Sequence, residues 1–261
     1  MPRFLLAFAV SILCAGCIRS TTSIELRADG SGTVLQETGI SSQALVMLKS
    51  MAPQGTGKES SSEMFTEDQA RKTAAAMGVT FVSGEPFKTA ELEGYRARYS
   101  FADITQVKVN MSQGMGGAST TSKEPPFAFL FDKGATASTL TIQMTEQGAI
   151  SGMNSLPGLP PGGGTTDADK AQAAQALAMM KMMLRGLFVD VSLNVDGRIV
   201  KTNAPHVEGS RVTLLQIDFD KLLADEASLL KLQSASDLKA LANVPGLKVA
   251  ADPKLTITFS K

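Results

Sequence analysis

Apolar and polar residues alternate in several short segments of the chain, as they do in half-buried β-strands. Residues 23–27 and 254–260 both follow this pattern. In Gly94–Ile104, aromatic residues and an alanine alternate with arginines and a serine. Because successive side chains of a strand point to opposite faces, this segment predicts a strand with one aromatic face and one basic polar face.

The segment Thr22–Ile40 is typical of a β-hairpin. Its centre reads Asp29-Gly30-Ser31-Gly32, and an Asp-Gly pair favours the positive φ that a tight turn requires. A second turn is expected at Asp196-Gly197. Further strands are predicted at Val79–Val82, Phe127–Phe131, Thr139–Thr145, Leu187–Val195, Arg198–Ala204 and Arg211–Phe219.

Helix signals occur at four places in the chain. Thr66 followed by Gln69 forms a capping box, and Gly78 is a natural C-cap, so we expect a helix over Glu67–Met77. Residues 168–185 are good helix formers, and Gly186 stops them. Two more helices are predicted, one from Ser41 or Ser42 to about Ser50 and one over roughly Lys221–Asn243.

Together these elements predict an α+β fold, a largely antiparallel β-sheet with helices packed on one face. The length suits a single domain over residues 17–261. Three segments rich in glycine, serine or proline, near residues 53–62, 110–126 and 151–167, are expected to be flexible linkers or exposed loops.

The first residues read MPRFLLAFAVSILCAGC. One basic residue, an apolar run from Phe4 to Leu13 and small residues before Cys17 are typical of a secretory signal peptide over residues 1–16. The junction resembles the lipobox of bacterial lipoproteins. That resemblance implies that Cys17 carries acyl chains, palmitate among them, and that these chains anchor the protein to a membrane. An ordinary cleaved signal with an incidental cysteine is the alternative.

The cysteine count agrees with lipidation. Cleavage before Cys17 leaves one cysteine in the mature chain, so no internal disulfide can form, and an acyl modification accounts for the unpaired thiol. The apolar run is about half of the ~20 residues that a spanning helix needs. The residue after Cys17 is Ile18 and not aspartate, and similarity to Gram-negative lipoproteins then favours the outer membrane, if the source has one.

Composition narrows the function classes. Lys and Arg total 25 and Asp and Glu total 25, and this balance argues against nucleic acid as a partner, since phosphate binding needs a basic excess. His206 is the only histidine, so a two-histidine metal site is excluded. The sequence contains no catalytic, metal or cofactor motif that we recognise, and we expect the protein not to be an enzyme.

A methionine-rich segment near the end of the helix expected over 168–185 is the candidate ligand groove. Methionine is flexible and fills irregular apolar surfaces, so such a segment can line an adaptable groove for a lipid or a peptide. Packing against the sheet as ordinary core, or docking on a membrane surface, are the alternatives. The candidate groove residues are Met179, Met180, Met182, Met183 and Leu187.

Two segments resemble LppM-type bacterial lipoproteins. They are the early hairpin Ile24–Val34 and the late segment Val195–Ala204, which leads to Gly209–Thr213. The resemblance implies an envelope lipoprotein with an α+β domain and lipid or glycolipid binding, and it carries over no catalytic residues. We therefore expect a non-enzymatic, lipid-anchored protein of the cell envelope or periplasm that binds a lipid or another amphiphile. The alternative is a protein–protein interaction or scaffold component of an envelope complex.

Overall fold

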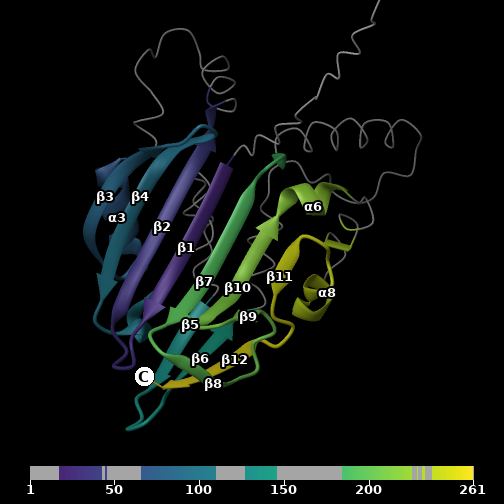
Figure 1. Ribbon diagram of the computed structural model, residues 1–261. Helices are drawn as coiled ribbons and strands as arrows, with labels where there is room; N and C mark the ends of the chain where they lie inside the picture. The colour runs from purple at the N-terminus through teal and green to yellow at the C-terminus, as the bar shows by residue number, and fades with distance from the viewer. Residues whose placement is uncertain are drawn as a thin grey trace, which may run out of the picture.

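In the computed structural model, the described part of the chain is rich in β-strands (Figure 1). The described residues are 18–42, 45, 66–109, 127–145, 184–224, 228, 231–232 and 237–260. The signal segment with Cys17 lies outside them, as do the three expected linkers and residues 168–183 of the helix predicted over 168–185. Of the residues from Ser41 to about Ser50, where a helix was expected, three are described: Ser41 ends a strand, and Ser42 and Leu45 are helical.

The described strands form two sheets, whereas the sequence predicted one. The larger sheet has eight strands and the smaller has four. Across the larger sheet the order is β11 (Leu247–Val249), β10 (Arg211–Asp218), β7 (Phe188–Val195), β1 (Ile18–Leu26), β2 (Gly32–Ser41), β4 (Leu92–Phe101) and β3 (Thr80–Lys88), with β9 (Val207–Glu208) also paired to β10. The smaller sheet has the order β5 (Phe127–Asp132), β6 (Ser138–Met144), β12 (Lys254–Ser260) and β8 (Arg198–Thr202).

The predicted hairpin at the start of the described chain is confirmed. β1 pairs antiparallel with β2, and Ile24 lies opposite Val34. In the turn, the Asp29 carboxylate accepts hydrogen bonds from the backbone N–H of Ser31 at 3.0 Å and from its hydroxyl at 2.7 Å. Gly30 has a φ of 92°, which a side chain would strain.

β1 also forms the one parallel pair among the described strands, with β7. Arg19 lies beside Phe188 and Leu26 lies beside Val195, so two segments about 170 residues apart in the sequence share the centre of the larger sheet. The other described pairings are antiparallel, which agrees with the predicted largely antiparallel character.

The described helices are few and short. α3 (Glu67–Met77) has the bounds that its capping signals predict: the Thr66 hydroxyl accepts the N–H of Gln69 at 3.2 Å, and Gly78 ends the helix with a φ of 70°. α6 (Phe219–Ala224) begins two residues before the single helix that was expected over roughly Lys221–Asn243, and α8 (Leu238–Ala242) lies within that range. A short 3₁₀ turn, η1 (Ile104–Gln106), follows β4. That the helices pack on one face stays a prediction.

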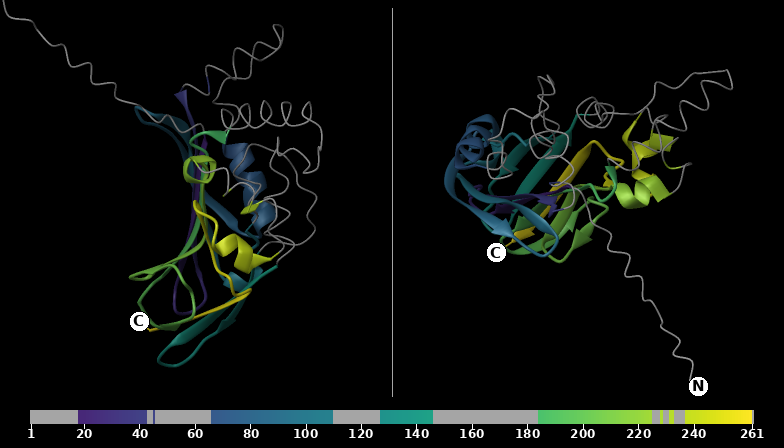
Figure 2. Two further views of the ribbon diagram at one scale, coloured as in Figure 1. Left: turned by 90° about the vertical axis from the view of Figure 1, so that its right-hand side faces the viewer. Right: turned by 90° about the horizontal axis from the view of Figure 1, so that it is seen from above.

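The smaller sheet packs at the end of the larger one where the β1–β2 hairpin turns (Figure 2). There the Ser138 hydroxyl donates to the carbonyl of Ala28 at 2.7 Å. The Asp196-Gly197 turn leads the chain from the larger sheet into the smaller one, because β8 pairs with β12 and not with β7. One continuous apolar core includes Ile24 and Leu26 of the larger sheet and Ile142 and Phe259 of the smaller.

Candidate functional site

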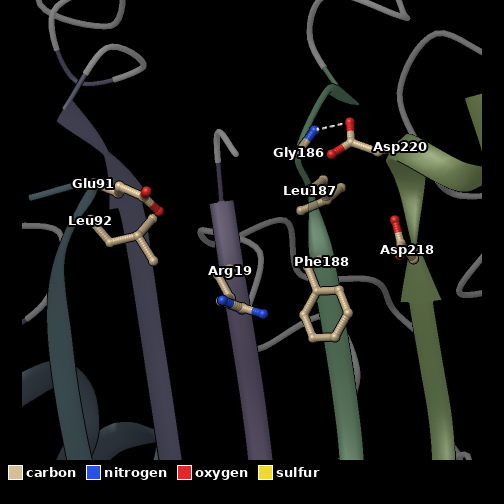
Figure 3. A pocket seen from close by; sticks show the side chains of 8 residues that line it. All are labelled: Arg19, Glu91, Leu92, Gly186, Leu187, Phe188, Asp218 and Asp220. Atoms are coloured by element: carbon tan, nitrogen blue, oxygen red, sulfur yellow. Dashed lines mark hydrogen bonds between the residues drawn. The ribbon is translucent and has the colours of Figure 1, made fainter. Parts of the chain in front are cut away.

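A pocket of about 270 Å³ lies at the end of the larger sheet where β1 begins (Figure 3). We call it the sheet-end pocket. Its lining combines four charged side chains with apolar ones. The residues that line it are Arg19, Glu91, Leu92, Gly186, Leu187, Phe188, Asp218 and Asp220.

Strand register brings three of these side chains to one face of the sheet. Arg19 of β1 lies beside Phe188 of β7, and Phe188 lies opposite Asp218 of β10. Residues at paired positions of neighbouring strands point to the same face. The other face of β1 carries Ile24 and Leu26, which are buried in the core. Arg19 therefore lines the pocket from the side of the sheet that points away from the core.

Arg19 lies between the two acidic sides of the pocket in Figure 3. Its guanidinium carbon is 4.8 Å from the centre of the Phe188 ring, which is within range of a cation–π interaction. Stacking of this kind leaves the N–H groups at the edge of the guanidinium available to an oxyanion.

One acidic side of the pocket is held by the start of α6. Gly186, at a φ of 71°, donates its backbone N–H to the Asp220 carboxylate at 2.8 Å. The N–H of Phe219 donates to the carbonyl of Leu187 at 3.1 Å. These two bonds tie the beginning of β7 to the beginning of α6 and fix the position of the Asp220 side chain.

Asp218 is partly neutralised by a neighbour. Its carboxylate accepts the backbone N–H of Lys221 at 3.2 Å and forms an ion pair with the Lys221 ammonium group at 2.8 Å. The hydrogen bond and the charge of Asp218 raise the pKa of Lys221 above its ordinary value.

The other acidic side comes from the loop between β3 and β4. The Thr89 hydroxyl accepts the backbone N–H groups of Leu92 at 2.9 Å and of Glu91 at 3.3 Å, which shapes a tight turn. The Glu91 side chain is exposed, and the Leu92 side chain is half-buried. The turn therefore presents a carboxylate and an apolar group side by side (Figure 3).

Of the predicted site residues, the structure describes one. Leu187 is 5% exposed and lines the sheet-end pocket. Cys17 and the four groove methionines, Met179, Met180, Met182 and Met183, lie outside the described residues. His206 lies between β8 and β9, where its carbonyl accepts the N–H of Thr213 at 3.0 Å.

Sequence reasoning missed the polar lining of the pocket. Arg19, Asp218 and Asp220 are ordinary charged residues near the ends of elements and form no motif. They meet because β1 pairs in parallel with β7, and no local sequence signal reports that pairing. Within the described ranges, no group of three or more histidine, cysteine or acidic residues could hold a metal ion.

No helix among the described residues has the length and apolarity to cross a membrane. Comparison with protein families gives no match, and comparison with curated proteins gives none. The chain is similar to a solved structure, the folded domain of the Mycobacterium tuberculosis LppM protein determined by NMR. The identity is 9% and the TM-score is 0.38, over 99% of this chain and 95% of that one, which is a distant resemblance.

Proposed function

We propose that this protein is a lipid-anchored lipoprotein of a bacterial cell envelope, that it binds an amphiphilic ligand and that it catalyses no reaction. The observation that carries the proposal is that the sheet-end pocket lies where β1 begins, at Ile18, directly after Cys17. An acyl chain on Cys17 would hold this end of the sheet close to the bilayer surface, without a linker between the lipid and the folded chain.

The pocket lining supports an amphiphile over a purely polar or purely apolar ligand. Arg19 and the carboxylates can hold a polar headgroup, and the Leu92 and Phe188 side chains can contact the apolar part next to it.

The residue after Cys17 bears on which membrane holds the protein. It is Ile18 and not aspartate, and similarity to Gram-negative lipoproteins then favours the outer membrane, if the source has one.

Lipid anchoring is tested by a matched pair of cysteine substitutions. We expect Cys17→Ser to lose both incorporation of labelled palmitate and recovery in the membrane fraction, because it removes the modified thiol. Cys14→Ser should retain both, because Cys14 leaves with the signal peptide. Labelling of the Cys17→Ser protein, or its full recovery with membranes, would refute the anchor.

Amphiphile binding is tested on the mature, full-length protein extracted from membranes in mild detergent. We expect native mass spectrometry to show a noncovalent lipid adduct in addition to the covalent acyl mass. Organic extraction should remove the adduct and leave the covalent mass. A protein that carries only its covalent acyl chains, and takes up no lipid when total envelope lipid is added, would contradict the binding role.

Docking on another envelope protein is the second candidate, and one observation favours it. The large hydrophobic side chains that are most exposed in the described chain lie on edge strands: Val82 on β3, Leu130 on β5 and Val200 on β8. Exposed edges can pair with another chain. Photo-crosslinkers placed at Leu130 and at Val200 test this alternative in the intact envelope. One adduct of constant mass from both positions, absent when the crosslinker is at the exposed Lys133, would support docking.

A further inference from the structure

The sheet-end pocket carries opposite charges at separate places. Arg19 occupies the middle, Glu91 lies on the side of β4, and Asp218 and Asp220 lie on the side of β10 (Figure 3). The carboxylates are not gathered around one point, in keeping with the lack of a metal-ligating group among the described residues. Acid groups on both sides of a cation suit a ligand that itself carries both signs of charge.

Arg19 has free capacity for an anion. Its side chain is exposed, its stacking partner is the Phe188 ring, and within the described ranges its guanidinium forms no ion pair. A guanidinium recognises phosphate through parallel N–H···O bonds, and the aromatic contact fixes its plane without using its donors.

Two of the carboxylates have capacity for an ammonium group. Glu91 is exposed, and in the described part of the chain its side chain has no ion pair. The Asp220 oxygen Oδ1 accepts the N–H of Gly186, and Oδ2 has no hydrogen bond among the described residues. Asp218 is already paired with Lys221 and contributes less.

The balance of charge decides between headgroup classes. Three carboxylates face one guanidinium in the pocket, and the ammonium group of Lys221 offsets one of them. The remaining negative charge disfavours a ligand with a net negative charge, such as a free phosphate or an anionic lipid. It favours a headgroup that carries both a phosphate and an ammonium group whose N–H groups can donate hydrogen bonds.

We propose that the sheet-end pocket binds the phosphoethanolamine-type headgroup of a zwitterionic phospholipid in the membrane that holds the anchored chain. Arg19 pairs with the phosphate, and Glu91 accepts a hydrogen bond from the primary ammonium group. Asp220, on the other side of Arg19, adds to the negative charge of the pocket. Leu92 and Phe188 contact the glycerol and the first methylene groups. This inference rests on the proposed function, because it names the ligand class of that same site.

The test is a native mass spectrometry titration of the mature, full-length lipidated protein with three short-chain lipids. The lipids are dihexanoyl phosphatidylethanolamine, phosphatidylglycerol and phosphatidylcholine. We expect phosphatidylethanolamine to bind about tenfold more tightly than phosphatidylglycerol, which has no cation. It should also bind more tightly than phosphatidylcholine, whose trimethylammonium group has no N–H to donate.

Two substitutions with matched controls test the assigned roles. Arg19→Gln should weaken phosphatidylethanolamine binding about tenfold. The control Arg98→Gln removes an exposed arginine on β4, outside the pocket, and should change nothing. Glu91→Gln should lower the preference for phosphatidylethanolamine over phosphatidylglycerol. Asp132→Asn, at an exposed position of β5, should leave that preference intact.

The outcomes separate this inference from the function on which it rests. If the three lipids bind equally, or if Arg19→Gln binds like the unsubstituted protein, the headgroup assignment is wrong and amphiphile binding stands. If no lipid binds to the unsubstituted protein, amphiphile binding itself is wrong. Because each variant is measured with its covalent acyl mass intact, loss of the anchor is not mistaken for loss of the site.

Discussion

At the scale of single residues, the carboxylate of Asp190 on β7 is buried in the larger sheet. Its side chain is 5% exposed and accepts a hydrogen bond from Arg211 at 2.6 Å. Burial raises the pKa of Asp190 above its ordinary value, and the charge of Arg211 opposes that rise. The ion pair therefore limits the free-energy cost of holding a charged carboxylate out of water.

The first prediction is that Arg211→Met destabilises the protein by about 2 kcal/mol at pH 7, because it leaves Asp190 charged and without its partner. The folded-state pKa of Asp190 is raised above the unfolded-state pKa, which is near 4. Protonation of Asp190 therefore stabilises the folded state, fully so below the unfolded-state pKa, and this stabilisation is lost as pH rises through the folded-state pKa. The penalty of Arg211→Met should therefore shrink as pH falls towards 4.

Urea unfolding at pH 7 and at pH 4.5 measures this pH dependence. Adding Asp190→Asn to Arg211→Met should recover part of the lost stability at pH 7, because the amide has no charge to desolvate. An equal penalty at both pH values, or no recovery in the double variant, would contradict the assignment of the cost to the buried charge.

Gly94 is a second residue whose role depends on close approach of two backbones. It lies opposite Gly39 in the pair of β2 and β4. A Cβ at position 94 would lie 2.1 Å from the carbonyl oxygen of Thr38 and 2.6 Å from the Cα of Gly39, so the two strands would have to separate.

We predict that Gly94→Ala lowers the free energy of unfolding by about 3 kcal/mol through this overpacking. The control is Gly209→Ala, where nothing lies within 4 Å of the added Cβ and only the φ of +62° opposes the substitution. That control should cost about 1 kcal/mol. Denaturant midpoints of the two variants decide the matter, and equal losses would show that backbone conformation rather than strand approach sets the cost.

At the scale of elements, α3 offers a direct test of local capping. The Thr66 side chain accepts the N–H of Gln69 at the start of the helix. We predict that Thr66→Ala costs about 1 kcal/mol, since it leaves one backbone donor of the first turn without its partner. Thr80→Ala, at an exposed position at the start of β3, should stay within about 0.5 kcal/mol of the unsubstituted protein. Equal effects would mean that the cap contributes nothing.

Elements that are defined by local chemistry were predictable from the sequence. The β1–β2 hairpin follows from Asp29 and Gly30, and α3 follows from Thr66 and Gly78. β12 was predicted with the bounds that the structure has, because its alternation is regular and both flanks are polar. In each case the signal and the structure that it specifies lie within about ten residues of each other.

Elements whose limits depend on distant partners were predicted less well. A strand was expected over Val79–Val82, but β3 runs from Thr80 to Lys88, past Gly84 and Pro86. It can do so because it is an edge strand, where a proline needs no hydrogen bond on its open side. β11 was not predicted from the sequence. This strand has three residues, which are too few to show a pattern of alternating apolar and polar positions.

At the scale of the whole molecule, the pairing of β1 with β7 was not predictable, and the site depends on it. Arg19 and Phe188 meet across this pair, and Asp218 joins them through the next strand. Local patterns predicted both strands but contained no information on which strands become neighbours. This is why Leu187 was the one pocket residue among the candidates from the sequence.

The last prediction concerns how the proposed anchor orients the molecule. β1 has nine residues, so about 30 Å separates the sheet-end pocket from the hairpin turn at the other end. β1 lies at the centre of the larger sheet and follows Cys17 directly in the sequence. An acyl anchor on Cys17 would therefore bring the pocket end of the sheet to the bilayer. A label beside the pocket should then be nearer to lipid headgroups than a label at Asp132, whose neighbour Phe131 lies against Gly30 in the hairpin turn at the far end.

Single cysteine labels can measure this difference in vesicles, because acylation would block Cys17. Fluorescence at Ala90→Cys should be quenched by nitroxide-labelled headgroups, and fluorescence at Asp132→Cys should not, since both positions are exposed. A 20-residue glycine-serine insertion between Cys17 and Ile18, with a root-mean-square span of about 25 Å, should abolish the difference while leaving the anchor intact. Equal quenching at the two positions before insertion would mean that the molecule does not stand on its pocket end. Unchanged quenching after insertion would mean that contacts other than the short tether hold the pocket at the membrane.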